Sequence, residues 1–206
     1  MNSLPRLFIG IFGVFLFAWV GLVALPYMQL GKLQPEVDAD TGALLPAGRS
    51  GLAEYGADVF AANGCMYCHS QQIRPAYAGY DLERGWGKRR TVPRDYIHEK
   101  PVFLGTMRTG PDLTNIGARQ PSREWHHQHL YNPQALSPGS IMPPFRFLYA
   151  KRERGERPLP NDAIPYPGDS PDSDEHYLVP SYEAKALVEY LLSLKRDYPL
   201  KEAPIE

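Results

Sequence analysis

The sequence predicts an all-α protein, with one N-terminal transmembrane helix followed by a helical globular domain that has long loops. Three observations predict this class. Residues 7–25 form an uncharged apolar run long enough to cross a bilayer. Apolar residues recur at helical spacing near residues 52–60 and 184–194. No segment shows successive alternating strand patterns, and 21 prolines and 18 glycines predict long irregular connections.

The transmembrane anchor is predicted over residues 1–30 from this apolar run, which begins after Arg6 and ends before Pro26. A helix of this length spans about 28 Å, close to the bilayer core of about 30 Å. A secretory signal peptide is the alternative, because it also combines a basic start with an apolar run. The run is longer than a typical signal core and the cleavage pattern near Ala24 is poor, so we expect an uncleaved anchor.

The rest of the chain divides into a tether over residues 31–50 and a domain over residues 51–206. The tether is rich in proline, glycine and aspartate and lacks apolar periodicity. Within the domain we expect three helices: one that stops at Asn63, one that Ser122 caps, and one that runs from Ser181 to about Arg196. The charged and proline-rich stretch 151–180 is predicted to be a surface excursion.

Charge and cysteine content exclude several classes of protein. The formal net charge is -1, so no basic excess exists to bind a phosphate backbone, and we expect no nucleic-acid partner. The two cysteines are too few for a disulfide framework or for an all-cysteine zinc site.

The chemistry of the chain is indicated by the C-x-x-C-H sequence Cys65-Met66-Tyr67-Cys68-His69, which is typical of covalent haem attachment. Two thiols at this spacing can each form a thioether to one haem vinyl group, while the adjacent imidazole binds the iron. A thioredoxin-like dithiol gives His69 no role, a zinc site needs further ligands, and a disulfide across two residues is sterically poor. We therefore expect one covalently attached haem c.

The second axial ligand has several candidates. We expect Met142, because the proline-stiffened segment Ser140-Ile141-Met142-Pro143-Pro144 can present a thioether to the opposite haem face. Met107 is expected to be a packing residue. His126, His127 and His129 stay possible, although we expect them to be polar surface residues or supports of the ligands. With both axial positions filled, the domain should carry electrons and not act as an enzyme on its own.

Two kinds of residue are expected to support the haem. Pro111 can offer its carbonyl to the second ring nitrogen of His69, which would fix the tautomer. Arg74, with Arg108 and Arg119 as further candidates, could pair with the haem propionates. Because c-type haem is attached outside the cytoplasm, we expect the N-terminus in the cytoplasm and the haem domain in the periplasm of a bacterium, anchored in the inner membrane.

The residues resemble the membrane-anchored mono-haem subunit, CcoO or FixO, of cbb(3)-type cytochrome c oxidases. The resemblance rests on three blocks: residues 64–75 with the attachment motif, residues 108–113 (Arg-Thr-Gly-Pro-Asp-Leu), and residues 124–143 from Glu124-Trp125-His126 to Ser140-Ile141-Met142-Pro143. It covers most of the chain from Met1 to about Phe145. Leu104 stands where the family usually has tryptophan, and the 151–180 excursion looks longer than expected.

The resemblance implies a class I cytochrome c-like domain with His69 and Met142 as axial ligands. It implies a role in which the subunit receives electrons from a di-haem or other cytochrome c donor. It would pass them to a haem-copper catalytic subunit that reduces dioxygen. Two alternatives stay open: the cytochrome subunit of a nitric oxide reductase, and a haem-based sensor with a displaceable sixth ligand.

Overall fold

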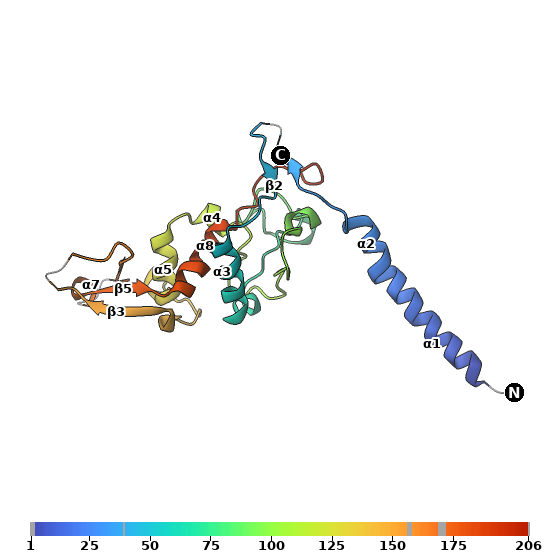
Figure 1. Cartoon of the computed structure of the whole chain (residues 1–206), viewed down its shortest axis with the longest axis horizontal. Coiled ribbons are helices and arrows are strands. Elements are labelled where there is room, and N and C mark those ends of the chain that lie inside the picture. The colour runs from blue at the N-terminus through green and yellow to red at the C-terminus, as the bar shows by residue number, and fades with distance from the viewer. Residues whose placement is uncertain (1–2, 39, 156–157, 169–171, 206) are drawn as a thin grey trace.

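A long N-terminal helix projects away from a body of shorter helices and small sheets (Figure 1). The computed structural model describes residues 3–38, 40–155, 158–168 and 172–205. The chain leaves the long helix, passes through a short hairpin and enters the helical body, and the C-terminus returns to lie beside that hairpin.

The N-terminal helix is continuous from Leu4 to Leu30, with a mean hydropathy of 2.5 and no buried residue. It consists of α1 (Leu4–Trp19), a π-helical turn (Val20–Ala24) and α2 (Leu25–Leu30). The helix continues past Pro26, although the uncharged apolar run in the sequence ends just before this residue. Pro26 has no amide hydrogen, and the amide of Leu25 donates to the carbonyl of Val20, so the widened turn carries the helix across the proline. The helix is long and apolar enough to cross a membrane.

Two helices form the centre of the body: α3 (Gly51–Ala62) and α8 (Tyr182–Ser193). The hydroxyls of Ser50 and Ser181 cap their first turns. The two helices cross closely at Gly56, where a Cβ would lie only 2.0 Å from the carbonyl oxygen of Ala186. Both helices lie where the sequence predicts them, although α8 ends at Ser193 and not near Arg196.

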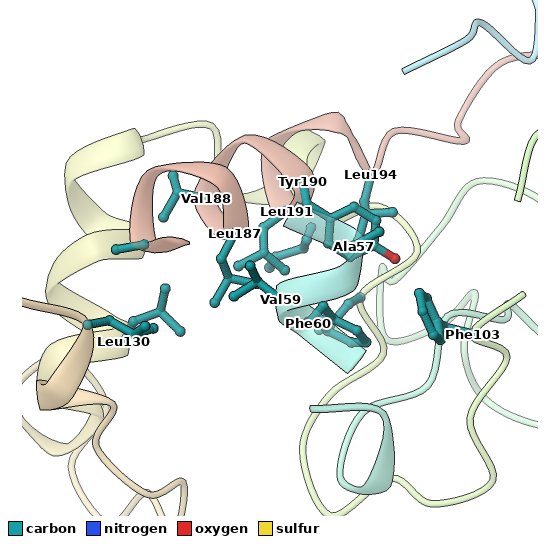
Figure 2. Close-up of a cluster of buried hydrophobic side chains, with 14 residues drawn as sticks. Ala57, Val59, Phe60, Phe103, Leu130, Leu187, Val188, Tyr190, Leu191 and Leu194 are labelled. Atoms are coloured by element: carbon teal, nitrogen blue, oxygen red, sulfur yellow. The ribbon is translucent and has the colours of Figure 1, made fainter. Parts of the chain in front are cut away.

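The hydrophobic core lies between these two helices and the segments around them (Figure 2). Phe60 on α3 packs against Tyr190 on α8 and against Phe103 from a loop, with ring centroids 5.3 and 5.6 Å apart. Leu130 joins the cluster from α5 (Arg123–Tyr131), the helix that Ser122 caps as predicted. The core therefore connects the helix before the attachment motif to the segment that leads to Met142.

The remaining helical elements are short and lie between long irregular segments. The α-helical ones are α4 (Ile116–Arg119), α6 (Pro133–Leu136) and α7 (Asp172–Glu175), and the 3-10 turns are η2 (Cys65–Tyr67), η3 (Ala76–Ala78), η4 (Pro93–Tyr96) and η5 (Arg146–Leu148).

The expectation of an all-α protein is wrong in two places. Strands β1 (Glu36–Val37) and β2 (Leu44–Leu45) form a hairpin in the predicted tether. In the predicted excursion, β3 (Tyr149–Glu153), β5 (His176–Pro180) and β4 (Ile164–Pro165) form an antiparallel sheet in the order β3-β5-β4. Residues 156–157 and 169–171 of that stretch lie outside the described residues.

The tether packs against the body. Arg94 binds Glu36 of β1 at 3.5 Å and Glu202 near the C-terminus at 2.5 Å. Arg49 pairs with the buried Glu99 at 2.5 Å, and Arg196 pairs with the same carboxylate. These ion pairs attach the segment that follows the apolar helix to the C-terminal part of the domain.

Candidate functional site

The attachment motif forms a tight turn at the C-terminal end of α3. Gly64 adopts a φ of 69°, which a residue with a Cβ rarely adopts, and reverses the chain into η2. The amides of Cys68 and His69 both donate to the carbonyl of Cys65, at 3.1 and 3.0 Å. Cys65 is half-buried, Cys68 is exposed, and both are free thiols. Burial raises the pKa of the Cys65 thiol to about 11, so this thiol is protonated at neutral pH.

His69 is held by the loop that contains Gly110 and Pro111. Its Nδ1 lies 2.7 Å from the carbonyl oxygen of Pro111, and the amide of Gly110 donates to the carbonyl of Cys68 at 2.9 Å. Burial lowers the pKa of His69, while the hydrogen bond to Pro111 acts in the opposite direction. A neutral ring whose Nδ1–H donates to Pro111 keeps a lone pair on Nε2, which is the form that binds a metal.

A buried carboxylate fixes this loop in place. Asp112 is fully buried and accepts hydrogen bonds from the hydroxyl of Ser70 at 2.7 Å and from the amides of Gln72 and Thr114 at 2.8 Å. Ser70 directly follows His69, and Asp112 directly follows Pro111. The network therefore holds the imidazole and its carbonyl partner in one position.

Met142 lies in the loop between α6 and η5. It is half-buried and packs against the same core cluster as Cys65 and Met66. Its loop is held by hydrogen bonds on both sides: the amide of Met142 donates to Ser140 Oγ at 3.3 Å, and the amide of Phe145 donates to the carbonyl of Leu130 at 2.8 Å. Met107 is 57% exposed. Of the two methionines weighed as ligands, Met142 is the half-buried one that packs on this cluster, and its role as a ligand stays a prediction.

The three histidines of α5 have other surroundings. His126 bonds the carbonyl of Gln120 at 2.9 Å, and His127 bonds the hydroxyl of Tyr149 at 3.0 Å. Both are buried because the helix turns this face toward the core, so the first of the two expectations, a surface position, is wrong for them, and a role as supports of the ligands stays a prediction. His129 stacks on Trp125 with ring centroids 4.5 Å apart. Within the described ranges, no group of three or more His, Cys, Asp or Glu residues could hold a metal ion.

The three candidate arginines differ in how far they are already engaged. Arg108 makes a two-pronged ion pair with Asp81, at 2.5 and 2.7 Å, and also donates to Ser70. Arg74 is exposed, and its charge helps to lower the pKa of Asp81. Arg119 donates to the carbonyl of Asp112, while its buried Nε has no hydrogen-bond partner among the described residues. Arg119 is therefore the candidate that retains an unused buried donor.

Three residues of this region were not singled out from the sequence: Ser70, Asp81 and Asp112. Their residue types alone do not indicate a role at the site, because a lone Asp or Ser in a loop is usually solvated. The sequence feature that could have indicated Ser70 and Asp112 is their position, since they directly follow His69 and Pro111.

The groups gathered here fit a haem that is bound through both sulfurs. Two free thiols, a neutral imidazole and a thioether come from two segments that pack on one cluster, and the unpartnered Nε of Arg119 can donate to a carboxylate. This is the donor set of a c-type haem with histidine and methionine ligands.

Comparison with known families gives one match. A model of the family described as "Cytochrome C oxidase, mono-heme subunit/FixO" matches residues 14–159, more than two thirds of the chain. The matched range contains part of the apolar helix, the attachment motif, the Pro111 loop and Met142. A search of curated proteins found no match.

Proposed function

Because the chain belongs to the FixO family of mono-haem cytochrome c oxidase subunits, we propose that it is the electron-transfer subunit of a cbb(3)-type terminal oxidase. In this role it takes electrons from a donor cytochrome, such as a di-haem subunit. It delivers them to the haem-copper subunit that reduces dioxygen. The chain is a relay within the complex and not its catalyst.

One observation carries this proposal: the attachment turn holds His69 against the Pro111 carbonyl at 2.7 Å, and Cys65 of the same turn packs on the core cluster where Met142 also packs. Cys65 and Cys68 would hold the haem by thioether bonds, and His69 and Met142 would bind its iron. The bound haem would supply an iron that alternates between the ferric and ferrous states and so carries one electron at a time.

The residues around the site have separate tasks in this proposal. The Pro111 carbonyl orients His69 and raises its basicity, while the Met142 thioether favours the reduced state. If both His69 and Met142 bind the iron, dioxygen would find no free position on it, as expected for a relay and not for a catalyst. Arg119 is the strongest candidate for a propionate partner, because Arg108 is already paired with Asp81 and Arg74 lies exposed at the surface.

The location follows from the anchor and from the chemistry of attachment. The helix Leu4–Leu30 would span the bacterial inner membrane once and contact lipid along its exposed face. Haem is attached to C-x-x-C-H motifs outside the cytoplasm, so the domain would lie in the periplasm and the N-terminus in the cytoplasm. The subunit would then deliver electrons at the periplasmic side of its complex.

Purification from native membranes tests the assembly. A chain with an affinity tag at its C-terminus should bring down a copper-containing subunit that consumes dioxygen when reduced cytochrome is supplied. Recovery with a nitric oxide reductase subunit would contradict the oxidase assignment. Carbon monoxide binding by the reduced subunit alone, at neutral pH, would show an open sixth position and contradict the relay.

A further inference from the structure

A recess of about 510 Å³ lies beside the attachment motif, between α3, the first turn of α8 and η5. We call it the α3–α8 recess. Its lining includes Tyr55 and Asp58 of α3, Asn63 at the end of that helix, Phe147 of η5 and Glu183 of α8. It is distinct from the ligand loops around His69 and Met142, and the function proposed above gives it no task.

The recess carries negative charge that the protein does not neutralise. Asp58 and Glu183 line it, and none of the described residues that line it is lysine, arginine or histidine. The basic residues that lie closest in sequence to the lining residues make other contacts. Arg146 lies over the ring of Tyr131, and Lys185 pairs with Asp162 at 2.6 Å. Asp58 therefore presents its charge to solvent, while Glu183 is half-buried in the first turn of α8, where hydrogen bonds from its own amide and from Ser181 lower its pKa.

This charge has a cost within α3 itself. Glu54 and Asp58 are both exposed and four residues apart, so their side chains are neighbours on one helix face. A like-charge pair at this spacing destabilises a helix by a few tenths of a kcal/mol. This cost is partly offset, because Glu54 lies in the first turn of α3, where the helix dipole favours a carboxylate.

Two aromatic side chains, Tyr55 and Phe147, line the recess together with the carboxylates. Tyr55 stacks on Tyr182 with centroids 5.6 Å apart, and Tyr182 and Phe147 are 63% and 71% exposed. Exposed aromatic groups near a recess are typical of protein interfaces, in which Tyr, Trp and Phe are enriched relative to the rest of the surface. The combination favours a protein partner over a small ion.

The position of the recess suits electron exchange. Asn63 in its lining lies two residues before Cys65, and Phe147 lies five residues after Met142. A protein seated in the recess would contact both segments that carry the proposed haem ligands. Its own redox centre would then be close to the site.

We propose that the α3–α8 recess docks the basic face of an electron-donor protein, with Asp58 and Glu183 facing lysine or arginine and the aromatic residues forming the apolar centre. This inference rests on the proposed function for its purpose, and on the charge and shape of the recess for its chemistry. Charged residues at the rim of such an interface mainly set the association rate and its salt dependence.

The test uses the full-length chain in detergent and mitochondrial cytochrome c, a lysine-rich protein, as the probe. Binding is measured by calorimetry at several ionic strengths, and reduction of the chain by the reduced probe is followed by stopped flow. Asp58→Lys should weaken binding about tenfold at low ionic strength and flatten the salt dependence of both readouts. Phe147→Ala should weaken binding and leave the salt dependence unchanged.

The matched control is Glu83→Lys, which makes the same charge change at an exposed residue outside the recess lining. It should leave binding within a factor of about two. Asp58→Lys also places Glu54 and a lysine in a favourable i, i+4 arrangement, so its effect cannot come from loss of α3. Equal effects of the two reversals, or no binding by the unmodified chain, would overturn the proposal. Calorimetry detects docking without electron transfer, so binding without reduction would instead count against the proposed function.

Discussion

Gly110 lies against the imidazole of His69 so closely that a Cβ on the glycine would be 2.3 Å from Cε1 of the ring. The next residue, Pro111, accepts the hydrogen bond from Nδ1. Gly110 therefore limits the space available to the imidazole ring, and Pro111 sets the direction in which the ring points. A side chain at position 110 would have to displace either the loop or the ring.

Replacement of Gly110 by alanine should therefore move His69 away from the Pro111 carbonyl. We expect a cost of about 1–3 kcal/mol in the free energy of unfolding, as for other overpacked sites. We also expect a smaller fraction of chain with the spectrum of a histidine- and methionine-ligated haem. Urea unfolding and optical spectra measure the two effects. Gly51→Ala is the control, because a Cβ at Gly51 meets nothing within 4 Å.

Met142→Ala tests the second axial ligand. Loss of the thioether should leave the iron five-coordinate or bound by another group, allow carbon monoxide to bind, and lower the midpoint potential by on the order of a hundred millivolts. Met107→Ala, at an exposed methionine, should change none of these. An unaltered spectrum for Met142→Ala would transfer the assignment to Met107 or to a histidine of α5.

Replacement of Arg119 and of Arg74, the two candidate partners of the haem propionates, should change the midpoint potential by different amounts. Arg119→Gln removes a half-buried positive charge whose guanidinium donates to the Asp112 carbonyl, and it should lower the midpoint potential, because the oxidised iron bears one more positive charge. Arg74→Gln changes an exposed charge that water and salt screen, so its effect should be smaller and should fade as salt is added. Redox titration of both variants at two salt concentrations decides between them. A larger shift in midpoint potential for Arg74→Gln than for Arg119→Gln would indicate that Arg74 is the partner of the propionates.

His127 should make the domain sensitive to acid. Burial lowers its pKa to about 4, with smaller contributions from the charges of Arg123 and His126. The unfolded chain, with a histidine pKa near 6.5, takes up the proton first as pH falls. Stability should therefore decline between about pH 6.5 and pH 4, and His127 should account for up to about 3 kcal/mol of that decline. Urea unfolding at several pH values should show a shallower decline for His127→Gln. Identical slopes would mean that His127 is not held neutral in the fold.

The helices of the body could be predicted because their signals are local. Ser50 and Ser181 mark the starts of α3 and α8, and Asn63 and Gly64 mark the end of α3, each through backbone hydrogen bonds or glycine geometry within a few residues. The attachment motif is equally local. Its role could be stated from five consecutive residues, and the match over residues 14–159 supports the family that the sequence blocks suggested.

The sheet around β5 could not be predicted because its stability depends on pairing between distant residues. Tyr149 pairs with Pro180, and Glu153 pairs with His176. The strands β3 and β5 are only five residues long, and β3 ends in three exposed charged residues, so neither of these two strands shows a clear alternation. The support network at His69 was hidden for the same reason. Ser70 and Asp112 meet only after 42 residues of chain have folded back on themselves.

The measurement that tests the central claim most directly is the intact mass of the purified, denatured chain, compared with that of the Cys65→Ser, Cys68→Ser double variant. The account predicts that the unmodified chain carries the added mass of one haem after denaturation and that the double variant carries none. A colourless unmodified chain at its bare polypeptide mass, or haem still covalently bound to the double variant, would contradict it.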